Sequence, residues 1–134
     1  MRVGFDLDIV GFDLDGVLTP IGRYNPNKKL AWWLFLGLIF IMPNKKMVEL
    51  LRNLAKQSII IIISARPERL KILTILWLRL HKIPFHNLFC VGLGKDANQR
   101  KLDVIKLMKI GKFFDDNPET VEYLKEYGIN ARLP

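Results

Sequence analysis

Five consecutive isoleucines, residues 59–63, constrain the fold more than any other feature of the chain. Successive side chains of a strand point to opposite faces of a sheet, so an unbroken apolar run predicts a strand that is buried on both faces. Such strands are typical of a parallel sheet that helices cover on both sides. We therefore expect an α/β protein in which residues 59–63 form a central strand.

The rest of the chain alternates short apolar runs with helical patterns. The first strand is expected to end at Phe12, with Ile9 to Phe12 as its core, and later strands are expected over 88–91 and 113–114. Helices are expected over 44–57, from Pro67 to His81, over about 102–108 and from Val121 to Tyr127, ending before Gly128. The chain has 134 residues and is 50% hydrophobic, which suits one domain. This order predicts a single three-layer, Rossmann-like domain over 1–134 with a central parallel sheet.

The composition indicates which binding partners and which cellular compartment to expect. Lys and Arg number 21 against 13 Asp and Glu, and a net charge of +8 raises nucleic acid or an anionic membrane as partners. The single cysteine, Cys90, excludes a disulfide framework and favours a cytoplasmic location. Asp6 and Asp8 interrupt the first residues before any apolar run, so we expect no cleavable signal peptide.

Polar side chains follow three of the predicted strands, and the carboxyl ends of parallel strands meet at one edge of a sheet. Asp13 and Asp15 follow the first strand, and Asp115 and Asp116 follow the last. Four converging carboxylates repel one another unless a cation lies among them, and their hard oxygen atoms favour Mg²⁺. Ser64, after the isoleucine strand, offers a hydroxyl and free backbone N–H groups to a phosphate. This combination predicts phosphoryl transfer.

The chain resembles the haloacid dehalogenase superfamily of phosphohydrolases, of the small-cap or capless type, from Phe12 to about Gly128. Four motifs carry the resemblance: FDLDGVLT, IIIISAR, a lysine at a helix start, and FFDDNPE. The first and fourth motifs together are specific, whereas paired aspartates alone also form turns and helix caps.

The resemblance implies a role for each motif residue. Asp13 would be the nucleophile that forms an aspartyl-phosphate, and Asp15 the general acid and base. Ser64 would bind the phosphoryl group together with Ala65 and Arg66. The Mg²⁺ ligands would be the Asp13 carboxylate, the Asp15 backbone carbonyl and Asp116, with Asp115 acting through water.

Three lysines, Lys95, Lys101 and Lys106, lie between the third and fourth strands. Lys101 is preferred as the catalytic, phosphate-neutralising lysine because it opens the pattern KLDVIKLMKIGKFFDD, where this superfamily usually keeps that residue. Lys106 would lie in the middle of the helix. Lys95, in a glycine-containing loop, remains the alternative.

Several of these residues also have purely structural interpretations. Ser64 could simply cap the helix that Pro67 begins, and Arg66 could pair with Glu68 or another surface acid instead of substrate. Cys90 is expected to be a small buried side chain. His81 and His86 lack metal-ligand spacing and are assigned to a helix end and a loop.

The amino terminus contains a near-repeat. Residues 4–10, GFDLDIV, are followed directly by residues 11–17, GFDLDGV. Only the second copy has the glycine and the following Val-Leu-Thr, so we place the active carboxylates there and expect Asp6 and Asp8 near the opposite end of the strand.

Residues of about 20–43 form an insert after the first strand, too short for a folded cap domain, which we expect to be a small lid. Its run from Leu30 to Met42 carries no polar side chain, but a bilayer span needs about 20 residues, so no transmembrane span is expected. The run could form a homo-oligomer interface, the preferred interpretation, or contact a membrane surface peripherally with Trp32 and Trp33.

The expected function is a Mg²⁺-dependent phosphatase that hydrolyses a small phosphomonoester, a nucleotide or a sugar phosphate. The basic surface would then recruit an anionic substrate, and nucleic acid is not the first partner expected. Two alternatives remain: a phosphatase that acts on nucleic-acid ends, and a weakly active or non-catalytic protein that docks through its apolar insert.

Overall fold

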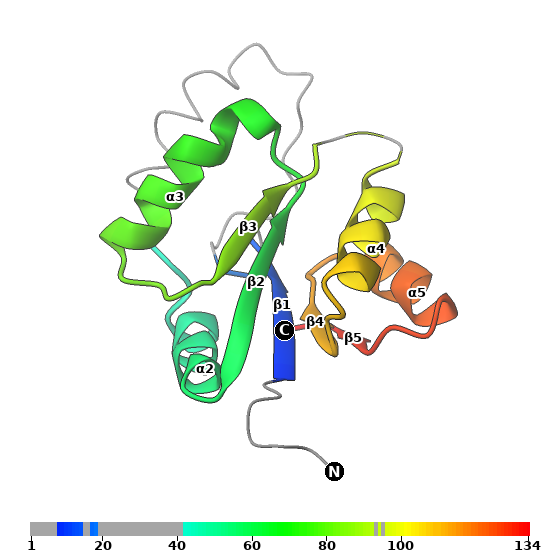
Figure 1. The fold of residues 1–134 in the computed structure, drawn as a ribbon, viewed down its shortest axis with the longest axis horizontal. Helices are drawn as coiled ribbons and strands as arrows, with labels where there is room; N and C mark the ends of the chain where they lie inside the picture. The colour runs from blue at the N-terminus through cyan, green and yellow to red at the C-terminus, as the bar shows by residue number, and fades with distance from the viewer. Residues whose placement is uncertain (1–7, 15–16, 19–41, 93, 95) are drawn as a thin grey trace.

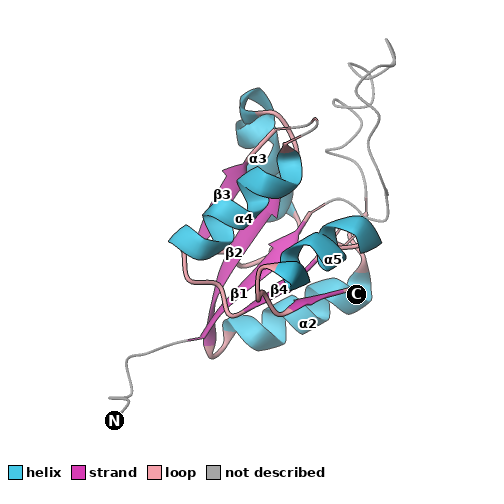
Figure 2. Ribbon diagram, turned by 90° about the vertical axis from the view of Figure 1, so that its right-hand side faces the viewer, coloured by secondary structure: helices cyan, strands magenta, loops and turns pink. Residues whose placement is uncertain are grey.

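A five-stranded, wholly parallel sheet forms the centre of the computed structural model, which describes residues 8–14, 17–18, 42–92, 94 and 96–134. The strand order is β3-β2-β1-β4-β5, and the strand arrows point the same way (Figure 2). The strands are β1 (Asp8–Asp13), β2 (Ser58–Ser64), β3 (Asn87–Cys90), β4 (Lys112–Phe114) and β5 (Ala131–Arg132).

Within the described part of the chain, four α-helices cover the two faces of this sheet: α2 (Lys45–Ala55), α3 (Lys71–Leu80), α4 (Ala97–Leu107) and α5 (Pro118–Glu126). A short 3₁₀ turn, η2 (Glu68–Leu70), precedes α3. Helices α2 and α3 lie on one side of the sheet, and α4 and α5 lie on the other (Figure 1). The predicted three-layer α/β fold is confirmed.

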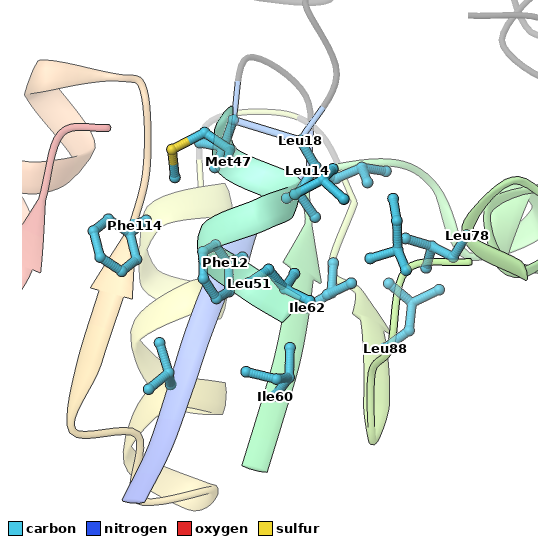
Figure 3. Close-up of a cluster of buried hydrophobic side chains, with 14 of the residues drawn as sticks. Phe12, Leu14, Leu18, Met47, Leu51, Ile60, Ile62, Leu78, Leu88 and Phe114 are labelled. Carbon is cyan, nitrogen blue, oxygen red and sulfur yellow. The ribbon is translucent and has the colours of Figure 1, made fainter. Parts of the chain in front are cut away.

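The isoleucine strand divides its side chains between two cores, as the run predicted. Ile60 and Ile62 pack with Leu51 of α2 and Leu78 of α3 (Figure 3). Ile61 and Ile63 face the other way and pack with side chains of α4 and α5, including Leu102, Ile105, Val121 and Leu124. Burial on both faces, with helices on each side, is what holds β2 at the centre of the fold.

The structure corrects three local expectations. Pro67 does not begin a helix, because it is extended (φ −61°, ψ 150°) and α3 begins only at Lys71, after η2. Helix α4 begins at Ala97, about five residues earlier than expected, because its first turn is polar and shows no apolar periodicity. Strand β5 was not anticipated, since its two residues are too few to make a pattern.

The predicted insert, residues 20–43, lies almost entirely outside the described residues. Its two ends are joined, because the Asn44 backbone N–H donates a hydrogen bond to the Leu18 carbonyl at 2.7 Å. The residues that flank the insert, Leu18 and Asn44, therefore lie side by side. Among the described residues, no helix is long and apolar enough to cross a membrane. The oligomer interface and the membrane contact expected of Leu30 to Met42 remain predictions.

Candidate active site

The topology brings the ends of β1 and β4 together. Asp13 is the last residue of β1. Phe12 pairs with Phe114, the last residue of β4, so Asp115 directly after β4 lies level with Asp13. The chain order reverses here, because β2 and β3 lie on one side of β1 while β4 and β5 lie on the other. Such a switch point is where open parallel sheets usually form their sites.

Three carboxylates gather at this point. Asp13, Asp115 and Asp116 each offer a carboxylate oxygen, and these oxygens lie within 4.8 Å of one another. Asp13 and Asp115 are buried and Asp116 is half-buried. Oxygen atoms at this spacing suit a hard divalent cation such as Mg²⁺. The fourth expected carboxylate, Asp15, lies outside the described residues.

Lys101 faces two of these carboxylates from the second turn of α4 rather than from its start. Its Nζ lies 2.7 Å from Oδ2 of Asp115 and 3.4 Å from Oδ1 of Asp13. Burial lowers the pKa of Lys101, but the carboxylates of Asp13 and Asp115 outweigh it and raise the pKa above the ordinary 10.5. Lys106 is exposed on the same helix, and Lys95 lies outside the described residues.

Asp115 is held by two donors. Its Oδ2 accepts from Lys101, and its Oδ1 accepts from the backbone N–H of Asn117 at 3.0 Å. Asn117 in turn caps α5 through a side-chain bond from the Glu119 N–H, and Pro118 occupies the first turn. The DDNP sequence thus ends β4, orients Asp115 and begins a helix within four residues.

Ser64 ends β2, one residue beyond the level of Asp13, and is almost completely buried. Its Oγ accepts from the backbone N–H of Arg66 at 3.0 Å, which is a local turn and not a cap of α3. The Ser64 carbonyl accepts from Val91, and the Arg66 carbonyl accepts from Gly92. The segment Ser64-Ala65-Arg66 is therefore tied to the end of β3.

Arg66 is buried, although a surface partner was one expectation for it. Its Nη1 donates to Oγ1 of Thr74 at 3.1 Å, and Thr74 donates to the Leu70 carbonyl. Glu68, the acid considered as its partner, lies 4.0 Å from Lys71. The sequence alone does not single out Thr74. Its only signal was a hydroxyl on the otherwise apolar inner face of α3.

Arg100 is a second residue near the site that the sequence alone does not single out. Its Nε donates to the Val91 carbonyl at 2.6 Å, and its Nη2 donates to the Gly92 carbonyl at 3.3 Å. Gly92 has φ +87°, a conformation that favours glycine. Arg100 thus fastens the chain just after β3, next to the segment that contains Ser64.

The other side chains considered earlier lie away from the carboxylates. Cys90 is buried, as expected. His81 follows the last residue of α3, and the Nδ1 of His86 accepts from the Ile60 backbone N–H. Asp8 lies at the opposite end of β1 from Asp13, exposed, and Asp6 lies outside the described residues.

Comparison with solved structures identifies the fold. A chain of the Pnkp1/Rnl/Hen1 RNA repair complex matches with a TM-score of 0.75 and 17% identity, over 96% of this chain and 42% of that chain. The haloacid dehalogenase domain of the effector Lem4 from Legionella pneumophila matches with a TM-score of 0.64 and 16% identity, over 98% of this chain and 87% of that domain. An enzyme of the same family from Bacteroides thetaiotaomicron, crystallised with magnesium and inorganic phosphate, matches with a TM-score of 0.60 and 12% identity, over 96% and 94%.

No protein-family model and no curated protein sequence matches the chain. The structural matches show that the chain has the haloacid dehalogenase superfamily fold. This chain spans well under half of the matched chain in the RNA repair complex.

Proposed function

We propose that the protein is a Mg²⁺-dependent phosphatase that hydrolyses a small phosphomonoester, a nucleotide or a sugar phosphate, through an aspartyl-phosphate. One observation carries the proposal: three carboxylates converge at the switch point of the sheet, and a buried lysine lies 3.4 Å from the first of them. The fold supports the phosphatase class, since the matched domains belong to this family of hydrolases.

Asp13 is the proposed nucleophile. The neighbouring Lys101 ammonium favours its ionised form, so a carboxylate oxygen is available to attack phosphorus. The bond between phosphorus and the ester oxygen breaks, and the departing oxygen takes a proton from Asp15. Ser64, Ala65 and Arg66 would hold the phosphoryl oxygens during this step, which leaves the phosphoryl group on Asp13.

Hydrolysis of the aspartyl-phosphate restores the enzyme. Water attacks phosphorus, Asp15 accepts its proton, and inorganic phosphate leaves with the original Asp13 carboxylate restored. Asp13, Asp15 and Asp116 would hold Mg²⁺, which supplies positive charge for the phosphoryl oxygens. Asp115, whose two oxygens already accept from Lys101 and Asn117, would orient the cluster and contact the ion through water.

A phosphatase that acts on nucleic-acid ends is the second candidate. It is favoured by the fold match to a chain of an RNA repair complex and by the net charge of +8.

A cytoplasmic location, inferred from the single cysteine, stays a prediction.

An assay with a generic aryl phosphate tests the proposal. Release of phosphate should require Mg²⁺ and stop with EDTA, and Asp116→Asn should need a higher Mg²⁺ concentration than the parent. Mg²⁺ should also raise the melting temperature of the parent, by an amount equivalent to about 2.7 kcal/mol at a hundred times its dissociation constant. Asp103→Asn, which changes an exposed aspartate of α4, is the matched control and should behave as the parent.

Phosphate release that is indifferent to Mg²⁺ and EDTA would contradict the metal-dependent mechanism. No release from aryl phosphate, nucleotides, sugar phosphates or oligonucleotide ends would favour the non-catalytic alternative. Release from oligonucleotide ends alone would select the second candidate.

A further inference from the structure

The outward face of α3 is apolar. Thr74, Trp77 and Leu78 are its buried residues, and the opposite face carries Ile72, Leu76 and Leu80, which are 74%, 51% and 62% exposed. Residues four apart on a helix are neighbours, so these three side chains form one continuous strip, the α3 ridge. A surface helix normally presents polar residues outward, and single exposed apolar residues are usually scattered. The α3 ridge therefore needs an apolar partner.

A hollow bordered by cations adjoins the ridge. Its volume is about 590 Å³, and it is lined by Arg52, Lys56, Arg79 and Lys82 together with Ala55, Ile83 and Pro84; we call it the α2–α3 groove. Arg79 directly precedes Leu80, so the groove and the ridge meet at this end of α3. Arg52 is held in place there, because its Nη2 donates to the His81 carbonyl at 2.9 Å.

The charge of the chain is concentrated on this side. Residues 44–86, which contain α2, β2 and α3, have nine Lys and Arg and two Asp and Glu, which is +7 of the net +8. The remaining residues are close to neutral. Helices α2 and α3 lie on the side of the sheet away from α4 and α5 (Figure 1). The excess positive charge thus belongs to the layer that carries the ridge.

The apolar ridge and the cations next to it together discriminate among the possible binding partners. A second copy of the chain could cover the ridge, but it would bring a second set of these cations against the first. Nucleic acid would neutralise the cations and leave the ridge in water. An anionic bilayer accepts both features, because its acyl boundary takes apolar side chains and its headgroup phosphates take Arg and Lys.

We propose that the α3 ridge and the α2–α3 groove form a docking surface for an anionic lipid bilayer. Helix α3 lies in the plane of the interface, with Ile72, Leu76 and Leu80 at the acyl boundary. Arg79 and Lys82 contact the lipid phosphates. The candidate active site and this surface lie on opposite faces of α3, since Arg66 of the site contacts the buried Thr74 while the ridge is on the outward face. Docking therefore does not depend on the proposed chemistry.

Vesicle flotation of the full chain tests the proposal. The protein should float with phosphatidylcholine vesicles that contain about 30% phosphatidylserine, bind much more weakly to pure phosphatidylcholine, and dissociate as salt rises above about 0.1 M. The triple variant Ile72→Gln, Leu76→Gln, Leu80→Gln should lose about tenfold or more in partitioning. Arg79→Gln and Lys82→Gln should each lose about fivefold on anionic vesicles.

Two matched variants control for the chemistry of the changes. Leu107→Gln alters a side chain of α4 that is 73% exposed, similar to Ile72, and Lys125→Gln alters an exposed cation of α5. Both should float as the parent does. Circular dichroism should be unchanged in every variant, because each altered side chain is exposed.

Three results would overturn the proposal. In the first, the parent does not float with anionic vesicles. In the second, the ridge variant floats as well as the parent, which would assign membrane contact to another segment. In the third, the parent self-associates through the ridge or binds single-stranded oligonucleotides through Arg79 and Lys82 in preference to vesicles, which would assign the surface to a second copy or to nucleic acid.

Discussion

The ammonium of Lys101 lies between the carboxylates of Asp13 and Asp115, 3.4 Å from the first and 2.7 Å from the second. One cation from α4 therefore serves two buried acids that end neighbouring strands. The same contact that joins α4 to β1 and β4 also places a positive charge beside the proposed nucleophile. Lys101 therefore contributes both to the stability of the fold and to the proposed chemistry.

Replacing this lysine should destabilise the fold. Lys101→Met keeps the length of the side chain but leaves Asp13 and Asp115 buried without their cation, and breaking a buried ion pair from one side costs about 3–5 kcal/mol. Chemical denaturation of the two proteins without Mg²⁺ measures the difference. Lys106→Met, on the exposed side of the same helix and 5.3 Å from the Tyr127 ring, should cost less than about 1 kcal/mol. Equal losses for the two variants would contradict the ion-pair account.

The contribution of Lys101 should depend on pH in the alkaline range. Its pKa in the folded protein is raised above 10.5, so the folded state binds the proton more tightly than the unfolded state does. The stabilisation is therefore complete below about pH 10.5 and is lost as the pH rises through the folded-state pKa. The difference in unfolding free energy between the parent and Lys101→Met should be constant from neutral pH to about pH 10 and should shrink above it. A difference that grows with alkaline pH would reverse the assigned sign.

Asp13→Asn should abolish turnover while the protein stays folded. The amide has nearly the same shape as the carboxylate but cannot form the aspartyl-phosphate, so kcat should fall by at least about 10³-fold. Asp8→Asn is the control, because Asp8 is exposed at the opposite end of β1, and Asp6→Asn tests the first copy of the near-repeat. Both controls should retain activity. Turnover by Asp13→Asn at the parental rate would remove Asp13 from the mechanism.

Gly11 should tolerate no side chain. A Cβ at this position of β1 would lie 2.6 Å from Cδ1 of Phe113 and 3.2 Å from two carbons of Ile110, so Gly11→Ala should destabilise the protein by about 1–3 kcal/mol. Gly111→Ala is the matched control. Its Cβ would meet only the Ile9 carbonyl oxygen at 3.7 Å, an ordinary contact, and the change in unfolding free energy should stay within about 1 kcal/mol. Thermal denaturation of both variants distinguishes a local clash at Gly11 from a general intolerance of added side chains in this part of the sheet.

The sequence was sufficient where a pattern is local and repeated. The isoleucine run predicted a strand buried on both faces, and β2 divides its side chains between the two cores. The predicted helix over 44–57 is observed as α2, because Asn44 caps it and its apolar face packs on the sheet. Helix α4 began earlier than predicted because its first turn is polar, so no apolar periodicity marks it.

The sequence by itself determined the fold class and the residue types available at the strand ends, because strand burial and turn chemistry depend on short stretches of chain. Only the tertiary structure decided which residues meet. It placed Lys101 against Asp13 and Asp115, buried Arg66 against Thr74, and left the outer face of α3 apolar and exposed. Each of these contacts, and the exposure of α3, depends on how separate elements pack across the sheet, which no local pattern records.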